Sequence, residues 1–210
     1  VRPGDLCVAA DSHANMYGAL GALGVAVSRS DAAGIWASGM FWWEVPQSVR
    51  VVFEGSLPQG ATGKDVALLL CALYPDDVLG AVVEFDGPGA ATLSRDDRLT
   101  ISNLTTEWGA IAGVFTEGCA VQADVGAPYA ATITFDLAAV SPHVAGPDTL
   151  ARAVPVGLLT PERIRIQKAY LVSCANGRLS DLEAAAAALR GRHVAPSVSL
   201  YLAAASASVQ

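Results

Sequence analysis

The sequence predicts an α/β protein with mostly parallel sheets. Short apolar runs that are typical of buried strands alternate along the chain with stretches that carry apolar residues at helical spacing. The chain has 210 residues, of which 52% are apolar and 16% charged, so it can bury a substantial core. Strands that alternate with helices form parallel sheets, because each helix returns the chain to the edge where the previous strand began.

The first elements follow from an apolar run and a glycine pattern. Residues 5–10 (DLCVAA) are short and almost wholly apolar, which predicts a buried strand. Gly18, Gly21 and Gly24 follow at a spacing of three, which predicts one helix with all three glycines on the side that approaches another backbone. This spacing differs from G-x-G-x-x-G, so it does not indicate a dinucleotide site. Residues 31–41 are a second predicted helix.

The middle of the chain repeats the strand and helix pattern. Residues 49–54 (VRVVFE) alternate between apolar and polar and predict a strand. Residues 58–63 are a predicted turn, and residues 64–73 are a predicted helix whose inward-facing residues are Val66, Leu69, Leu70 and Leu73. Residues 81–86 (AVVEFD) are the next strand, which ends at Gly-Pro-Gly.

One long helix is predicted over residues 99–114. Asn103 and Glu107 are four residues apart and would share one face of that helix. Residues 132–137 (TITFDL) alternate as a strand. Residues 141–148 (SPHVAGPD) are rich in proline and glycine and are the best predicted linker in the chain.

The last part of the chain predicts a strand, a helix and a second strand. The strands are residues 168–173 and 198–203, and the helix is the alanine-rich stretch 180–190. Ser180 and Glu183 have the spacing of a capping box at the start of that helix.

Charge and hydropathy exclude two classes of partner. The net charge of −7 leaves no basic face for phosphates, which argues against nucleic-acid binding. The mean hydropathy is +0.41, yet the least charged stretch, residues 14–28, is interrupted by polar residues and glycines and is too short to span a membrane. Because the first residue is Val1 and not Met, we expect both ends to be cut from a longer chain.

The four cysteines form no C-x-x-C pair. With three histidines in the chain, a complete zinc site is not expected. Cys7, Cys71 and Cys119 are predicted to be small buried apolar residues. Two interpretations are open for Cys174: it is a buried cysteine of the core, or it is a functional thiol.

Two polar clusters stand where a predicted strand gives way to a helix. They are Asp11-Ser12-His13 and Cys174-Ala175-Asn176. In open α/β sheets the loops at the carboxyl ends of strands form the binding crevice, and helix N-termini there attract anions. The first cluster can handle a proton and hold a carboxylate. Its alternative is a capping Asp or Ser beside a surface histidine, and the alternative for Asn103 and Glu107 is a solvated helix face.

Five motifs occur in one order over nearly all of the chain. They are residues 11–24 (DSHANMYGALGALG), 29–43 (RSDAAGIWASGMFWW), 62–66 (TGKDV), 96–109 (DDRLTISNLTTEWG) and 170–182 (YLVSCANGRLSDL). In these motifs the chain resembles the aconitase superfamily, and within it the homoaconitases of the fungal type. The resemblance implies incomplete aconitase-type iron–sulfur α/β/α domains. It divides the chain into the end of a first domain (residues 1–48), a second domain (49–148) and the start of a third, cluster-binding domain (149–210).

The resemblance also implies a site, residue by residue. The implied catalytic residues are Asp11, His13 and Glu107. The implied substrate-binding residues are Ser12, Asn103 and Asn176. Cys174 matches the first of three cysteines that hold a 4Fe-4S cluster.

The implied activity is that of a hydro-lyase that interconverts homocitrate, cis-homoaconitate and homoisocitrate in lysine biosynthesis via aminoadipate. Alternatives within the family are an aconitase or the large subunit of 3-isopropylmalate dehydratase. A different alternative is a truncated, non-catalytic member that acts as a binding module. The implied compartment is the mitochondrial matrix in a eukaryote and the cytoplasm otherwise.

The implied partners are a small tricarboxylate substrate, a segment with the missing C-x-x-C, and a swivel domain, in cis or as a small subunit. Neither nucleic acid nor a membrane is an expected partner. Because one cysteine cannot hold a cubane cluster, we expect this segment alone to be inactive.

Overall fold

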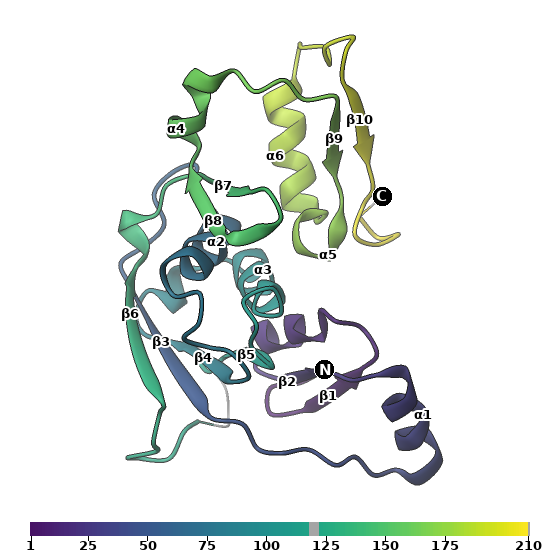
Figure 1. Cartoon of the computed structure of the whole chain (residues 1–210), viewed down its shortest axis with the longest axis vertical. Coiled ribbons are helices and arrows are strands. Elements are labelled where there is room, and N and C mark those ends of the chain that lie inside the picture. Colours follow the sequence, from purple (N-terminus) through teal and green to yellow (C-terminus); the bar gives the residue numbers. More distant parts are fainter. Residues whose placement is uncertain (118–121, 210) are drawn as a thin grey trace. The chain divides into compact units, whose positions relative to one another are not determined.

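The computed structural model of the chain describes residues 1–117 and 122–209 and divides it into two compact units, Val1–Val154 and Pro155–Gln210 (Figure 1). No helix in these two stretches is both long and apolar enough to span a bilayer. The family-based division at residues 48 and 148 stays a prediction.

The first unit carries most of the secondary structure. Its strands are β1 (Leu6–Ala9), β2 (Leu23–Ala26), β3 (Ser48–Glu54), β4 (Val82–Asp86), β5 (Ala112–Phe115), β6 (Ala131–Asp136), β7 (His143–Gly146) and β8 (Thr149–Pro155), whose last residue crosses the boundary. Its helices are α1 (Arg29–Ser38), α2 (Gly63–Leu73) and α3 (Arg95–Leu104), with the 3-10 helices η1 (Ala14–Leu20), η2 (Ala90–Thr92) and η3 (Leu137–Ala139).

The second unit is a small parallel βαβ unit. Its elements are α4 (Val156–Leu159), the 3-10 helix η4 (Thr160–Glu162), β9 (Lys168–Leu171), α5 (Ser173–Asn176), α6 (Leu179–Leu189) and β10 (Ser199–Leu202). Strands β9 and β10 pair in parallel, with Lys168 opposite Ser199.

The predicted parallel sheets are confirmed. The main sheet has the order β5-β4-β3-β6, and each neighbouring pair is parallel. Strands β1 and β2 form a separate parallel pair, with Leu6 opposite Leu23. Because the strands of each of these sheets are parallel, they all end at the same edge of their sheet.

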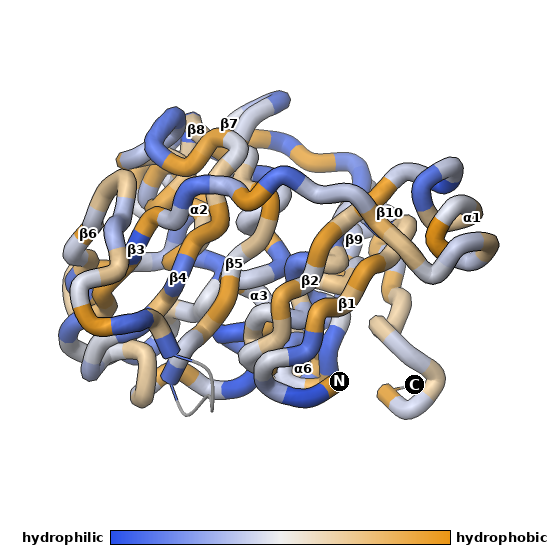
Figure 2. Tube along the Cα trace, turned by 90° about the horizontal axis from the view of Figure 1, so that it is seen from below, coloured by the Kyte–Doolittle hydropathy of each residue, from blue (hydrophilic) through white to orange (hydrophobic). Residues whose placement is uncertain are grey.

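The core lies between the main sheet and helices α2 and α3. Alternate residues of β3 point into it, and Phe53 is fully buried there. The ring centroids of Phe53 and Phe85 are 5.6 Å apart, and those of Phe85 and Phe115 are 5.0 Å apart, both in stacked arrangement. Figure 2 shows the apolar residues that run along β3, β4 and β5. The three stacked rings therefore join three adjacent strands under the two helices.

Three helices begin with a capping box that the sequence prediction missed. Ser28 and Asp31 start α1, Thr62 and Asp65 start α2, and Ser94 and Asp97 start α3. In each box a carboxylate three residues into the helix accepts the cap residue's N–H, which satisfies a backbone donor that has no partner within the helix.

The predicted glycine helix is wrong as a single helix. Gly18 lies in η1, Gly21 ends it with φ of +73°, and Gly24 lies in strand β2, which was not predicted. The expected close approach is present at two of the three positions. A Cβ on Gly18 would lie 1.7 Å from the carbonyl oxygen of Gly113, and a Cβ on Gly24 would lie 2.0 Å from that of Ala14.

The predicted helix over residues 99–114 is also wrong in its extent. Helix α3 starts earlier, at Arg95, and ends at Leu104. The chain then turns and enters β5, and Gly109 takes a φ of +87° that an L residue in a helix does not adopt. Asn103 is therefore in the last turn of α3, whereas Glu107 is in the turn that follows.

Two further predictions on the local structure are wrong. The expected linker at residues 141–148 contains β7, and the backbone N–H of His143 donates to Asp65 Oδ1 over 2.8 Å, which ties it to α2. Helix α6 begins one residue earlier than predicted, after Arg178. Its third residue, Asp181, accepts the Arg178 N–H over 3.1 Å, so the box predicted at Ser180 does not form.

The core makes a testable prediction on helix α2. Leu70 is 1% exposed, as predicted, whereas the prediction that Leu73 faces inward is wrong, because this last residue of the helix is 56% exposed. We expect Leu70→Ala to lower the free energy of unfolding of the first unit by about 2–5 kcal/mol, because it removes buried methyl groups and leaves a cavity. Leu73→Ala is the matched control and should cost less than about 1 kcal/mol. Denaturant unfolding followed by circular dichroism measures both, and equal losses would contradict the placement of the core.

Candidate active site

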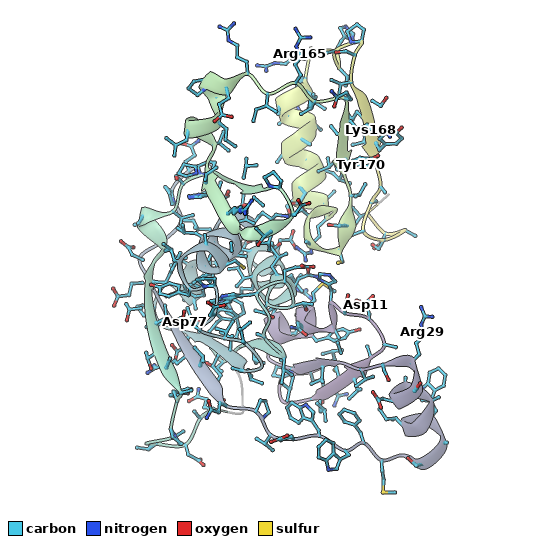
Figure 3. The ribbon with its side chains drawn as sticks, in the orientation of Figure 1. Asp11, Arg29, Asp77, Arg165, Lys168 and Tyr170 are labelled. Carbon is cyan, nitrogen blue, oxygen red and sulfur yellow. The ribbon has the colours of Figure 1, made fainter. Side chains whose placement is uncertain are left out.

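The Asp11-Ser12-His13 loop joins β1 to η1, and Figure 3 labels Asp11 there. Asp11 Oδ1 accepts the backbone N–H of His13 over 2.8 Å, and the Asp11 carbonyl accepts the N–H of Ala14 over 3.2 Å. These two bonds fold the loop into a compact turn, as an Asp side chain commonly does. The turn leaves Asp11 and Ser12 exposed and directs the half-buried imidazole of His13 toward α3.

The imidazole of His13 lies between two side chains from distant sequence. Its Nδ1 is 2.9 Å from Asn103 Oδ1, and its Nε2 is 3.4 Å from Glu107 Oε1. With the amide oxygen as acceptor, Nδ1 is the nitrogen that carries hydrogen, and Nε2 faces the carboxylate. The arrangement can therefore hold one exchangeable proton between Nε2 and Glu107.

Burial differs sharply across this group. Asn103 is 0% exposed, the His13 side chain is 25% exposed and the Glu107 side chain is 50% exposed. The ring is thus anchored on the buried side and meets its proton partner on the solvent side. An acid–base pair that reacts with a molecule from solution needs this order.

Glu107 is held by the turn that follows α3. The Trp108 backbone N–H donates to the Leu104 carbonyl over 3.1 Å, and the Trp108 indole Nε1–H donates to the Tyr74 carbonyl over 2.7 Å. Trp108 is buried, so its neighbour Glu107 is fixed at the backbone even though its side chain is half exposed. Asn103 and Glu107 are therefore brought together by the end of α3 and the turn after it, and not by one continuous helix.

Cys174 and Asn176 lie in the second unit, on the short helix α5. Cys174 is exposed and forms no disulfide with another described cysteine. Asn176 Nδ2 donates to Asp181 Oδ1 over 3.0 Å, while its buried Oδ1 has no hydrogen-bond partner in the described part of the chain. Ser173, directly before the cysteine, has a φ of +97°, a strained conformation of the kind found at functional sites.

Arg178 holds the turn that carries Cys174. Its guanidinium is buried and donates to two carbonyls, that of Ala175 over 2.7 Å and that of Cys174 over 2.8 Å. The planar fork of Arg suits two adjacent acceptors. Sequence reasoning missed this residue, although it stands within the quoted motif at residues 170–182.

The fit of a 4Fe-4S cluster to these residues is limited by the number of donors. Cys174 offers one exposed thiol, the ligand type that such clusters use. Within residues 1–117 and 122–209, no group of three or more His, Cys, Asp or Glu side chains is placed to share a metal ion. The described residues fit one corner of a cluster and do not hold one by themselves.

The other cysteines are only partly as predicted. Cys71 is buried, as expected, and Cys7 is half-buried. Cys119 lies outside the described residues, as does part of the stretch after Phe115. Burial, with a smaller contribution from the Glu107 carboxylate, raises the pKa of the Cys71 thiol from 9.0 to about 12. The core alternative for Cys174 is wrong, because that residue is exposed.

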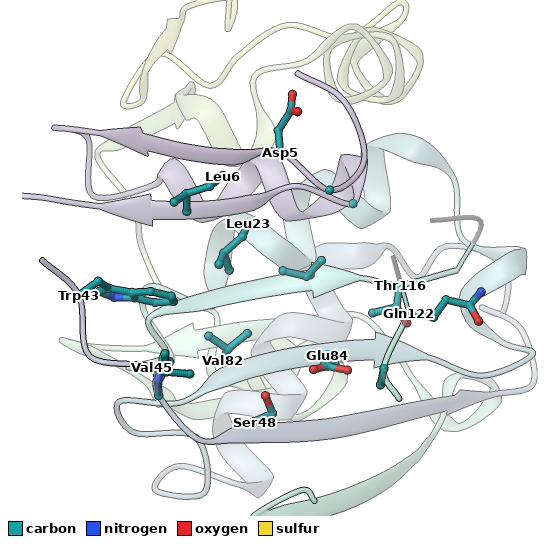
Figure 4. A pocket seen from close by; sticks show the side chains of 15 residues that line it. Asp5, Leu6, Leu23, Trp43, Val45, Ser48, Val82, Glu84, Thr116 and Gln122 are labelled. Carbon is teal, nitrogen blue, oxygen red and sulfur yellow. The ribbon is translucent and has the colours of Figure 1, made fainter. Parts of the chain in front are cut away.

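The first unit contains several pockets. One of about 260 Å³ is bordered by Glu107, Cys71 and Trp108. A larger apolar one, of about 450 Å³, lies between β1–β2 and the main sheet and is lined by side chains such as Leu23, Trp43 and Val82 (Figure 4). None of the predicted site residues is among the residues that line the larger pocket.

Comparison with known proteins gives concordant matches. The aconitase family (aconitate hydratase) matches residues 1–121 and 116–210. The "Homoaconitase, mitochondrial" of Eremothecium gossypii is 45% identical over 246 residues, which cover 99% of this chain and 36% of that protein. The proteins of the same name from Cryptococcus neoformans var. neoformans (strain JEC21) and Yarrowia lipolytica are both 44% identical and cover 99% of this chain and 35% of their own length. The chain thus spans about a third of the length of these relatives.

Thiol reactivity tests the difference between two cysteines. At pH 8 about one Cys71 thiol in 10,000 is ionised, given a pKa of about 12, and the thiolate is the reactive form. We expect iodoacetamide to label Cys174 and to leave Cys71 unlabelled in the folded protein, and to label both in denaturant, as read by peptide mass spectrometry. Labelling of native Cys71 at the rate of Cys174 would contradict the structure.

The same pKa predicts a loss of stability at high pH. Folding raises the thiol pKa of Cys71, so the protonated thiol favours the folded state and this contribution is complete below pH 9. It is lost progressively as the pH rises from about 9 toward 12. A Cys71→Ala variant should show a shallower decline of the unfolding free energy over that range. An identical decline in both proteins would refute the assignment.

Arg178 makes a prediction about local opening in the second unit. Arg178→Lys keeps the charge but replaces the planar fork, whose two terminal nitrogens each bond one carbonyl, by a single ammonium on a shorter side chain. We expect the Gly177 amide, which donates to the Ser173 carbonyl over 2.9 Å, to exchange its hydrogen roughly 10- to 100-fold faster, because charge-assisted bonds are lost. Arg190→Lys, at the exposed end of α6, is the matched control and should leave that rate unchanged. Equal exchange in the two variants would show that the fork does not hold the turn.

Proposed function

The chain belongs to the aconitase family, and on this premise we propose that it is part of an iron–sulfur hydro-lyase of the homoaconitase type. The proposed reaction is the reversible removal and re-addition of water that links homocitrate, cis-homoaconitate and homoisocitrate in lysine biosynthesis via aminoadipate. One observation carries the proposal: the His13 imidazole is held between Asn103 and Glu107, with Nε2 directed at the carboxylate.

The proposed work of His13 and Glu107 is proton transfer to and from oxygen. A hydroxyl leaves carbon as water only if it gains a proton, and the reverse reaction returns that proton. The proton held between Nε2 and Glu107 Oε1, 3.4 Å apart, is available for both directions. Asn103 contributes through His13, because its amide oxygen on Nδ1 fixes the tautomer that leaves Nε2 toward the carboxylate.

Asp11 and Ser12 complete the proposed site in the first unit. The Asp11 carboxylate already accepts the His13 backbone N–H over 2.8 Å, so its first task is to fix the loop beside the ring. The hydroxyl of Ser12 is exposed at the same loop and can donate to a substrate carboxylate. Asn176 in the second unit is the remaining proposed substrate contact.

Cys174 is proposed as one of three thiolate ligands of a 4Fe-4S cluster. When bound, such a cluster supplies a Lewis-acidic iron for the leaving hydroxyl. We propose that the other two thiolates belong to a C-x-x-C segment, and that the base for the carbon-bound proton belongs to a swivel domain, both outside these 210 residues. This segment alone would then be inactive. The homoaconitases named above are about three times as long as this chain, which leaves room for both parts.

The proposed compartment of this protein is inferred from the names of its relatives. The three relatives named above are described as mitochondrial, and we propose the mitochondrial matrix for this protein in a eukaryote and the cytoplasm otherwise. Aconitase and 3-isopropylmalate dehydratase stay as alternatives for the substrate. We also propose that the chain comprises the end of a first domain (residues 1–48), a second domain (49–148) and the start of a third (149–210).

Anaerobic reconstitution of the protein expressed from its whole gene tests the function. The reconstituted protein is assayed for hydration of cis-homoaconitate and cis-aconitate side by side. We expect a cluster, faster turnover of cis-homoaconitate, loss of the cluster in Cys174→Ser, and a loss of kcat of about 10²–10⁴-fold in Glu107→Gln, because that change removes the acid–base group.

The controls separate the alternatives. Cys7→Ser removes a half-buried thiol at β1 and should keep both the cluster and the activity. Faster turnover of cis-aconitate would keep the site and overturn the substrate. Absence of a cluster in the complete protein would refute the enzyme and leave the non-catalytic binding module.

A further inference from the structure

We propose that Asn15, Thr105 and Thr106 are positioning residues that fix the distance between His13 and Glu107. The inference rests on the proposed function, in which these two side chains share and transfer a proton. None of the three residues belongs to the site implied by the family resemblance.

Asn15, Thr105 and Thr106 form what we call the clamp, and its first part is buried. Asn15 and Thr105 are each 1% exposed, and Asn15 Nδ2 donates to Thr105 Oγ1 over 2.9 Å. The same hydroxyl donates to the Ser102 carbonyl over 2.7 Å. One hydroxyl thus accepts from η1, which follows His13, and donates to the helix that carries Asn103. A buried hydroxyl that makes both bonds has a single defined orientation.

The second part lies nearer to solvent. Thr106 Oγ1 donates to the Ser12 carbonyl over 2.7 Å. Thr106 directly precedes Glu107, and Ser12 directly precedes His13. This bond therefore connects the two backbone positions that carry the proposed proton pair.

The pair needs such support from its neighbours. His13 and Glu107 are 3.4 Å apart with half-exposed side chains, and an ion pair of this kind contributes little to its own geometry. The Asn15–Thr105 and Thr106–Ser12 hydrogen bonds join residues 90 and 94 positions apart in sequence. At 2.9 and 2.7 Å they are shorter than the 3.4 Å between His13 and Glu107. The clamp, and not the attraction between the charges, sets the separation.

Backbone packing makes the clamp stiff. A Cβ on Gly18 would lie 1.7 Å from the Gly113 carbonyl oxygen, so η1 rests directly on strand β5. A Cβ on Gly113 would in turn lie 2.4 Å from Thr105 Cγ2. The methyl group of Thr105 fills this seam while its hydroxyl holds Asn15. Threonine satisfies both demands, whereas valine lacks the hydroxyl and serine lacks the methyl group.

Thr106 offers the cleanest test, because it is only half-buried and its loss should not unfold the protein. In the complete protein, Thr106→Val should lower kcat roughly tenfold with KM little changed, since the hydroxyl does not touch substrate. Thr106→Ser keeps the donor and should restore kcat. Thr92→Val is the matched control: Thr92 Oγ1 donates to the Gly89 carbonyl over 2.8 Å, outside the site, and its loss should leave kcat unchanged.

A readout that does not need activity uses the imidazole itself. The ¹⁵N resonances of the His13 ring, assigned with His13→Asn, are recorded at one pH in the 210-residue chain and its variants. We expect Thr106→Val to shift the Nε2 resonance, and Thr106→Ser and Thr92→Val to leave it in place. The thermal midpoints of Thr106→Val and Thr92→Val should agree closely, which separates positioning from general stability.

The outcomes distinguish this inference from the function on which it rests. A shifted resonance in Thr106→Val, in a protein without hydro-lyase activity, would support the clamp and overturn the proposed function. An active protein in which Thr106→Val changes neither kcat nor the resonance would overturn the clamp alone. A fall in kcat that Thr106→Ser fails to restore would also overturn it.

Discussion

The close contact between η1 and strand β5 is the constraint on which the candidate site depends. It exists because Gly18 and Gly113 carry no side chains, so that one backbone rests on the other. The contact brings the loop after β1 to the end of α3, about 90 residues away in sequence. Without it the His13 ring would have neither Asn103 on one nitrogen nor Glu107 near the other. Two glycines thus determine which polar side chains meet.

The polar groups at this contact are graded by burial. The fully buried Asn103 fixes one side of the imidazole, and the half-exposed Glu107 faces the other. A buried amide is a reliable anchor because leaving it unpaired is costly, whereas an exposed carboxylate stays free to exchange protons. As a result, the Nδ1 of His13 is held by a buried amide, whereas its Nε2 faces an exposed carboxylate. Cys71 borders the same pocket as Glu107 and adds no competing charge, since burial raises the pKa of its thiol to about 12.

Short apolar runs are a direct sign of burial, and from them the sequence alone predicted the parallel strands β1, β3, β4, β6, β9 and β10. It missed β2 and placed β5 within a helix. It failed where side chains end a helix. Leu104 and Trp108 keep a helical spacing, yet α3 stops at Leu104, where the Thr105 hydroxyl bonds to the Ser102 carbonyl and Gly109 takes a positive φ. The meeting of His13 with Asn103 and Glu107 was reached only through the family resemblance, since no local pattern encodes a contact across 90 residues. The supporting threonines stand in the quoted motif at residues 96–109, but nothing in their spacing marked them as contacts of the loop after β1.

The two compact units differ in how much of the proposed chemistry each contains. The proton-handling group of His13, Asn103 and Glu107 is formed wholly by residues of the first unit. The second unit contributes Cys174, on a turn with strain at Ser173 and two bonds from buried Arg178. A strained turn persists only when its surroundings hold it, and under the proposed function this turn presents the Cys174 thiolate to the cluster. Under the proposed function, the group that exchanges the oxygen-bound proton is therefore formed by this chain alone, whereas the metal site and the base for the carbon-bound proton need residues from beyond it.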